Sequence, residues 1–388
     1  MTDIKSLFLF GDEISYLNHG SFGACPKLVF EDYQKWQLKL EQGAMHFMIN
    51  EAPELLKKSR KALATFVHCA AEDLVYVTNP SYAINIIVKS FGFNTGDEIL
   101  ATDIEYGALD KTWDYYCQRS GAKYVRQPIT LPVQSSKQLV DDFFKGLTNK
   151  TKAIFISHIT STTALKLPVK EICKRAKEEG LLTIVDGAHV PGQIDLNLQE
   201  LEADVYTGAC HKWLLTPKGC SFLHVKKEFQ ERFDPLIISW GYESANPSDS
   251  LFKDYHEYQG TRDYSAFLTV PKALEFRDTY NWSSVSEKRR QLVQKNYQPL
   301  CDLLNSRPIC AVSDEFLGQM CSIPISTPNP AQLQTTLFEK HKVELPIMLQ
   351  NDSIYLRISL QGYNDQSDID RLKAAITDIK KTSSLLVN

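Results

Sequence analysis

Short apolar runs alternate with helix-like segments up to about residue 265, and this alternation limits the fold more than any other feature of the chain. The runs lie at 74–78, 97–103, 153–159, 181–186 and 220–225. Between two of them, the segment 168–180 begins with Pro168, repeats apolar residues at helical spacing and ends at Gly180. Strands that alternate with helices of this length predict an α/β fold, with a mainly parallel sheet covered by helices on both faces.

The pattern changes after about residue 265. A long, charged helical pattern at 283–304 precedes strand-like runs at 320–326 and 353–359, and a last helix is expected at about 366–381. These elements predict a smaller α+β domain. The predicted division of the 388 residues is a large domain at 16–264 and a small domain at 1–15 and 265–388.

Composition and charge exclude several classes of function. The net charge is −4 and no block of basic residues occurs, which argues against nucleic acid or an anionic membrane as a partner. No apolar run approaches the length of a membrane span, and the first residues lack the features of a signal peptide, so we expect a cytoplasmic protein. The nine cysteines form no C-x-x-C pair, and neither HExxH nor GxSxG occurs. No metal site is predicted.

Two residues at predicted strand ends could carry chemistry. Asp186 ends the apolar run 181–186, where parallel α/β sheets bind ligands, although a capping role in the next turn is favoured when Asp186 is taken alone. Lys212 follows about one strand–helix–strand unit later, in a run of small residues after an apparent strand. Its small and apolar neighbours predict desolvation, which lowers the pKa of a lysine and makes it nucleophilic. Most lysines are solvated surface residues, and Lys218 fits that alternative better.

A lysine and a carboxylate at one sheet edge are the two fixed points of pyridoxal phosphate (PLP) chemistry. The lysine holds the aldehyde of the cofactor, and the carboxylate keeps its pyridine nitrogen protonated. The protonated ring can then accept electrons from the α-carbon of a substrate.

Short segments of the chain resemble the class V aminotransferase family, which belongs to fold type I of the PLP-dependent enzymes. The resemblance covers nearly the whole chain, and the segment 16–26 is similar to the isopenicillin N epimerase-like branch, which includes carbon–sulfur lyases acting on cysteine-derived sulfoxides. It implies a seven-stranded type of sheet in the large domain. The segments are YLNHGSFGACP (16–26), TNPSYAIN (78–85), DIEYGA (103–108), VDGAH (185–189), HKW (211–213), PKG (217–219), YQGTRDYSA (258–266) and LRISLQGYN (356–364).

The resemblance implies roles around the cofactor ring. Lys212 would hold the aldehyde as a Schiff base and move the α-proton of the substrate, and Asp186 would pair with the pyridine nitrogen. His189 would lie near the phenolic oxygen. Tyr106 would stack on the ring face, where cysteine desulfurases carry a histidine. As an isolated residue, Tyr106 could be a core aromatic, and an ordinary buried histidine is the more common interpretation of His189.

The resemblance also implies roles at the phosphate. Ser81, Tyr82 and His211 would hold the phosphate group, with help from backbone N–H groups at a helix start. Thr261 would reach the phosphate of the neighbouring subunit, which implies a homodimer with shared active sites. Ser81 could also be a turn residue after Pro80. At position 209 the chain has alanine, where relatives often have a polar phosphate ligand.

Substrate contacts follow from the same resemblance. Arg357 would bind the α-carboxylate of an amino acid through a two-pronged contact, and an arginine directed inward from a strand needs an anion. Asn18 and His19 would line the substrate side. His158 could also face the cofactor, but the sequence gives it less support.

One departure from the family concerns cysteine. Cysteine desulfurases need a nucleophilic cysteine on a loop upstream of the carboxylate-binding arginine. No cysteine lies between His341 and Arg357, and Cys310 and Cys321 come earlier, with Cys321 in a strand-like run. A persulfide mechanism is therefore disfavoured.

The favoured function is a PLP-dependent enzyme that acts on an amino acid through α-proton abstraction. Epimerisation and carbon–sulfur cleavage by β-elimination are both open, and transamination is the third alternative. A non-catalytic PLP-binding regulator is a further alternative, although no basic helix-turn-helix pattern accompanies the enzyme-like segments.

Overall fold

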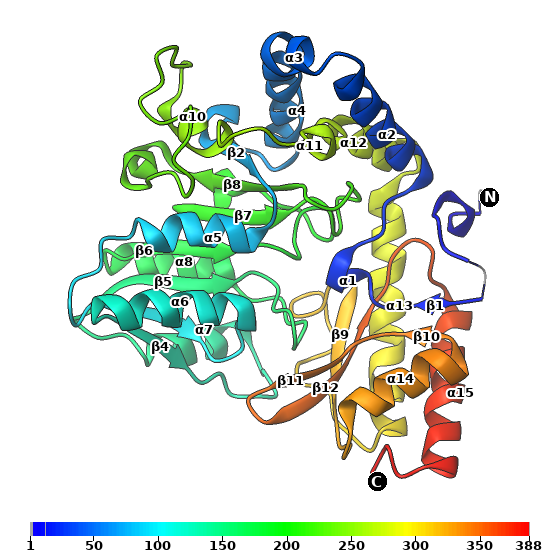
Figure 1. Cartoon of the computed structure of the whole chain (residues 1–388). Coiled ribbons are helices and arrows are strands. Elements are labelled where there is room, and N and C mark those ends of the chain that lie inside the picture. Colours follow the sequence, from blue (N-terminus) through cyan, green and yellow to red (C-terminus); the bar gives the residue numbers. More distant parts are fainter. Residues whose placement is uncertain (1–2, 12, 388) are drawn as a thin grey trace.

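A seven-stranded sheet forms the centre of the computed structural model, which describes residues 3–11 and 13–387 (Figure 1). The strand order is β2-β8-β7-β6-β5-β3-β4. β8 runs opposite to the other six strands, so its pairings with β2 and β7 are antiparallel and the remaining pairings are parallel. The mainly parallel α/β sheet predicted from the sequence is thus confirmed. The strands are β2 (Leu74–Val77), β3 (Glu98–Thr102), β4 (Lys123–Gln127), β5 (Thr151–Ser157), β6 (Leu182–Asp186), β7 (Val205–Ala209) and β8 (Ser221–Val225).

Helices cover both faces of this sheet, because successive residues of its strands point in opposite directions. Ile154 of β5 belongs to one hydrophobic cluster and Phe155 to another. The first cluster includes residues of α7 (Ser136–Phe144) and α8 (Val169–Glu178). The second includes residues of α5 (Pro80–Lys89) and α6 (Gly107–Ser120). The sheet is therefore buried between two helical layers.

Two central-sheet strands, β4 and β7, do not coincide with any of the predicted apolar runs, although an apparent strand was expected before Lys212. β4 forms the edge of the sheet, and its side chains are only half-buried or exposed. An edge strand tolerates charged residues such as Lys123 and Arg126, so its sequence lacks the apolar pattern of the inner strands.

The C-terminal part is built around an antiparallel sheet of three strands in the order β11-β12-β9. Near the N-terminus, β1 (Ser15–Tyr16) pairs in parallel with β10 (Val343–Glu344), so the N-terminal segment packs against the C-terminal part of the chain (Figure 1). The division at residues 16 and 265 stays a prediction. The other elements of this part are β9 (Met320–Ile325), β11 (Ile347–Gln350), β12 (Ser353–Ser359), α13 (Trp282–Leu303), α14 (Pro330–His341) and α15 (Gln366–Thr382).

Two general features of the described residues bear on function. No helix among them combines the length and the apolar character needed to cross a bilayer. They also contain no group of three or more histidine, cysteine or acidic side chains arranged to hold a metal ion.

Candidate active site

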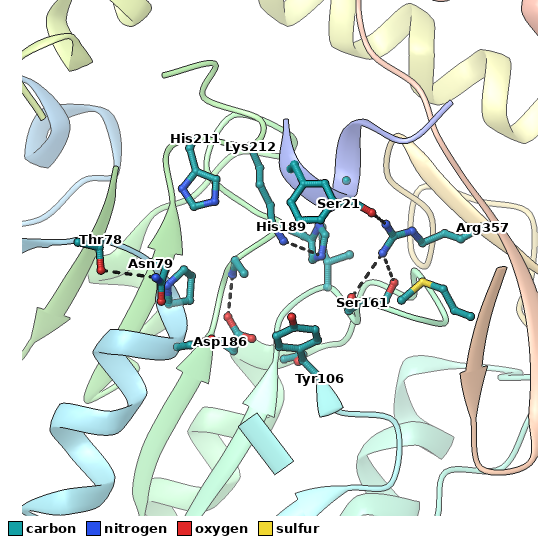
Figure 2. A pocket seen from close by; sticks show the side chains of 18 of the residues that line it. Ser21, Thr78, Asn79, Tyr106, Ser161, Asp186, His189, His211, Lys212 and Arg357 are labelled. Carbon is teal, nitrogen blue, oxygen red and sulfur yellow. Dashed lines mark hydrogen bonds between the residues drawn. The ribbon is translucent and has the colours of Figure 1, made fainter. Parts of the chain in front are cut away.

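A cavity of about 620 Å³ lies at the carboxyl ends of β5, β6 and β7 (Figure 2). The short helix α1 (His19–Phe22) and β12 close it from the side of the C-terminal part. Its volume is within the range of small-molecule sites. The lining residues are Gly20, Ser21, Phe22, Thr78, Asn79, Pro80, Ser81, Tyr106, Ser157, Ile159, Ser161, Asp186, Ala188, His189, His211, Lys212, Gly219, Met348 and Arg357.

Lys212 reaches this cavity from the turn after β7. Its Nζ atom lies 3.3 Å from Nε2 of His189. The pKa of Lys212 is lowered to about 8. Burial is the largest cause, the charge of Arg357 acts in the same direction, and Asp186 opposes the shift. An appreciable fraction of Lys212 is therefore the neutral, nucleophilic amine near neutral pH.

The tautomer of His189 follows from its second neighbour. Trp213 Nε1, which can only donate, lies 3.4 Å from Nδ1 of His189. Nδ1 is then the acceptor and Nε2 carries the hydrogen. Burial lowers the pKa of His189 well below its usual range, and the charge of Lys212 adds to the effect. His189 is thus a neutral imidazole that presents an N–H group to the cavity.

Asp186 is the last residue of β6 and is 4% exposed. Its Oδ1 accepts a hydrogen bond of 2.9 Å from the N–H of Ala188, so the capping interpretation holds for one oxygen. Oδ2 accepts no hydrogen bond from the described residues. Burial raises the pKa of Asp186, whereas the Ala188 hydrogen bond and the Lys212 charge lower it. A cationic partner in the cavity would stabilise the carboxylate.

Glu105 is a buried carboxyl group beside the cavity that the sequence did not single out. One oxygen accepts from Thr102 Oγ1 at 2.6 Å, and the other accepts from the backbone N–H and the hydroxyl of Ser157. Burial raises the pKa of Glu105 to about 8, although the Ser157 and Thr102 hydrogen bonds oppose this. Glu105 thereby fixes Ser157, which lines the cavity next to Asp186 in the sheet.

The start of α5 forms another wall of the cavity. Asn79 caps this helix by accepting from the N–H of Tyr82 at 2.8 Å. Pro80 has no N–H, so the hydroxyl and backbone N–H of Ser81 are the next donors at the helix start, where an anion is favoured. The Tyr82 hydroxyl instead donates to Gln259 at 2.7 Å, and the Tyr82 side chain is not among the lining residues.

His211 lies near this helix start. Its Nδ1 is 3.0 Å from the carbonyl oxygen of Cys220, which can only accept, so Nδ1 carries the hydrogen. Burial lowers the pKa of His211 to about 4, the charge of Lys212 adds to this, and the Cys220 hydrogen bond opposes it. Nε2 is then an acceptor in the neutral ring, and binding an anion there requires His211 to gain a proton. Thr261 is exposed and lies outside the lining residues.

Arg357 of β12 is a buried cation without a carboxylate partner among the described residues. Nη1 donates to the carbonyl oxygen of Ser161 at 2.8 Å, and Nη2 donates to Ser21 Oγ at 2.7 Å and to Asn18 Oδ1 at 3.4 Å. Its Nε is buried with no partner in the described part of the chain, and the residue is 1% exposed. Burial lowers the pKa of Arg357 to about 10, and ionised Tyr16 and Tyr106 would raise it. Such a group favours an anion that enters the cavity.

Asn18 and His19 lie behind the lining residues rather than in them. Asn18 contacts Arg357, as described above. Nε2 of His19 donates to the carbonyl oxygen of Lys212 at 3.0 Å, and Nδ1 accepts from the Tyr363 hydroxyl at 2.9 Å. His19 therefore holds the backbone of Lys212 instead of facing the cavity.

Three further sequence features have clear positions. The ring of His158 lies 3.1 Å from the Tyr206 hydroxyl, and His158 does not line the cavity. Ala209 is buried at the end of β7. No cysteine lines the cavity in the part of the chain that the structure describes, and every cysteine except Cys69 is buried.

The side chains of the cavity fit a phosphorylated pyridine aldehyde. A lysine with a lowered pKa could react with the aldehyde, and a buried carboxylate could pair with the ring nitrogen. The start of α5 could hold the phosphate, and Arg357 retains an unpartnered buried Nε for an anionic substrate group.

Comparisons with known proteins agree with this fit. The family model "Aminotransferase class-V" matches residues 25–372. Isopenicillin N epimerase from Amycolatopsis lactamdurans is 32% identical over 95% of this chain and 96% of its own length. A probable chloroplastic L-cysteine desulfhydrase from Arabidopsis thaliana is 29% identical over 97% and 86%. A solved variant of the cystine C–S lyase C-DES, with glycine covalently linked to its PLP cofactor, superposes with a TM-score of 0.81 at 20% identity and covers 97% of this chain and 100% of its own.

Proposed function

Because the chain belongs to the class V aminotransferase family of PLP-dependent enzymes, we propose that it removes the α-proton of an amino acid and either epimerises the substrate or cleaves a carbon–sulfur bond by β-elimination. The observation that carries this proposal is the pair of Lys212 and Arg357 on one cavity. One is an amine with a pKa near 8, and the other is a buried guanidinium without a carboxylate partner in the described residues.

Each residue has a distinct part in the proposed reaction. Arg357 binds the α-carboxylate and so orients the amino acid. Lys212 holds the cofactor between turnovers and, once released, accepts the α-proton at Nζ. PLP, when bound, supplies the electron sink that makes this proton acidic. Asp186 would hold a proton on the pyridine nitrogen of the bound cofactor, and the Nε2–H of His189 would be available as a donor to its phenolic oxygen.

The substrate side of the cavity bears on the alternatives. Phe22, Ile159 and Met348 contribute apolar atoms here, and Arg357 is the only cation on this side among the described lining residues. A transaminase that uses a dicarboxylic keto acid needs a second cation for the distal carboxylate. Transamination with such a partner is therefore less well supported than epimerisation or elimination.

Carbon–sulfur cleavage in this cavity would not pass through an enzyme persulfide. The cavity lining of the described chain includes no thiol. Sulfur would then leave from the β-carbon of the substrate by elimination.

We also propose that the protein is a homodimer with shared active sites. Ile238 and Trp240 are 62% and 87% exposed, which is unusual for large apolar side chains. Their loop is hydrogen-bonded to the segment before Thr261 through Gly241 and Tyr258. Light scattering should give twice the chain mass, and Trp240→Lys should favour the monomer.

A cytoplasmic location stays a prediction from the sequence.

A product screen tests the proposed reaction. The purified holoenzyme would be incubated in D₂O with D- and L-amino acids, cysteine conjugates and keto acids, and products would be identified by mass spectrometry. We expect deuterium at the α-carbon, with inversion or with release of a sulfur product. Amino acids that remain unlabelled, together with an absorbance spectrum that no amino acid alters, would favour a non-catalytic binding protein.

A further inference from the structure

Lys212 and Tyr106 come from opposite sides of the cavity. Lys212 follows β7, whereas Tyr106 lies between β3 and α6, and β6 and β5 separate the two strands in the sheet. Three strand spacings of about 4.8 Å place the strand ends roughly 14 Å apart. Figure 2 shows the two side chains entering the cavity from opposite walls. A substrate carbon between them would have one of these groups on each face.

Tyr106 is a proton carrier of the lining whose hydroxyl has no hydrogen-bond partner among the described residues. His189 lies beside Lys212 on the same side, and Nδ1 of His211 is bonded to the carbonyl oxygen of Cys220. Arg357 keeps its proton near neutral pH because its pKa is about 10. The Tyr106 side chain is 42% exposed, and its hydroxyl makes no hydrogen bond to any described residue.

We propose that Tyr106 is the second proton carrier of this site, with its hydroxyl serving the face of the substrate α-carbon opposite Lys212. The proposal rests on the function proposed above and selects epimerisation as the reaction that this cavity catalyses. The same two groups act in exchanged roles on the other enantiomer.

The proton balance of the step is complete without another reactant. The α-C–H bond breaks on one face, and its proton goes to Nζ of Lys212. A new C–H bond forms on the other face with the proton of the Tyr106 hydroxyl. The resulting ammonium of Lys212 and phenolate of Tyr106 then exchange protons with solvent, so both groups return to their starting states and the substrate is only inverted.

The test uses a substrate without a leaving group at the β-carbon, L- or D-2-aminobutyrate, with the holoenzyme in D₂O. Wild type should give the opposite enantiomer with deuterium at the α-carbon. Tyr106→Phe should lower the inversion rate on the order of 100-fold or more, as expected for loss of a general acid. Exchange with retention, which needs only Lys212, should fall much less.

Two controls separate this role from a structural one. Tyr115→Phe changes an exposed tyrosine (54%) of α6, the helix that follows Tyr106, outside the cavity lining, and should behave as wild type. Absorbance titration, which needs no turnover, should show that the Tyr106→Phe holoenzyme still binds both enantiomers with dissociation constants close to those of wild type.

The outcomes are distinguishable. Inversion by Tyr106→Phe at the wild-type rate would overturn the proposal. Wild type that never inverts the α-carbon but eliminates sulfur from cysteine conjugates would also overturn it while leaving the proposed function intact. Absence of α-labelling and of elimination with every amino acid would overturn both.

Discussion

Nζ of Lys212 lies 3.3 Å from Nε2 of His189, and the hydrogen on this contact belongs to the imidazole. The indole of Trp213 donates to the other ring nitrogen, so Nε2 is the protonated one. Lys212 can accept this hydrogen only as a neutral amine. Burial lowers the pKa of Lys212 to about 8, so the fraction of neutral amine that can make this contact grows as the pH rises toward 8.

Replacement of this lysine should remove the covalent link to the cofactor. Lys212→Ala should abolish the adduct that borohydride reduces, measured as a mass increase of the intact chain. Lys218→Ala is the matched control, because Lys218 is exposed and donates to the carbonyl oxygen of Gly23. A reduced adduct that persists in Lys212→Ala would refute the assignment.

The pH dependence of cofactor attachment should reflect the lowered pKa of Lys212. Only the neutral amine attacks an aldehyde, and its population grows as pH rises toward the pKa. The attachment rate of the apo-protein should rise about tenfold per pH unit well below pH 8 and level off above it. Stopped-flow absorbance measures this rate. A rate that keeps rising toward pH 10 would indicate an ordinary lysine.

Local sequence patterns were sufficient for the residues whose position depends on one strand. Asp186 ends an apolar run, and Lys212 follows the next strand, so the parallel sheet alone brings both to one edge. Arg357 alternates with buried neighbours in β12, and an inward cation requires an anion. These three could be predicted because one regular element determines where each side chain points.

Contacts between distant loops could not be predicted in this way. In the sequence, Glu105 is only an acidic residue near a predicted helix start. It becomes the partner of Ser157 because the fold brings the end of β5 next to it. His19 was expected to face the substrate, yet its partners are 193 and 344 residues away in the sequence. No local pattern specifies which loop such a side chain will meet.

Asp186 should matter for turnover more than for cofactor retention. Asp186→Asn keeps the size of the side chain and its oxygen acceptor for Ala188 but removes the charge that holds a proton on the pyridine nitrogen. Turnover should fall on the order of 100-fold or more, as for other preorganised electrostatic contacts. Cofactor content, measured by absorbance after gel filtration, should remain well above that of an apo-protein. Near-normal turnover would contradict the proposed role.

Thiol reagents should not inactivate the enzyme under native conditions. Eight of the nine cysteines are buried, and burial together with Asp73 raises the pKa of the partly exposed Cys69 to about 12. Thiolates, which react with alkylating agents, are therefore scarce at pH 7.5. Iodoacetamide should leave both α-proton exchange and any sulfur release intact. Rapid loss of sulfur release alone would indicate a catalytic cysteine and a persulfide step.

Arg357 should contribute to recognition of the α-carboxylate and little else in the substrate. Arg357→Met removes the guanidinium but keeps an unbranched apolar side chain in a buried site. Loss of a buried, hydrogen-bonded charge pair typically costs about 2–5 kcal/mol, which corresponds to at least tenfold weaker binding. The dissociation constant of an amino acid, measured by absorbance titration of the holoenzyme, should increase accordingly.

A matched pair of ligands separates this effect from a general disturbance of the cavity. 2-Aminobutyrate carries the α-carboxylate, whereas propylamine has the same chain without it. Wild type should prefer 2-aminobutyrate strongly, and Arg357→Met should reduce that preference by weakening 2-aminobutyrate alone. Equal weakening of both ligands would mean that Arg357 holds the loops around Ser161 and Ser21 rather than the substrate, because its hydrogen bonds to those residues would then account for the whole effect.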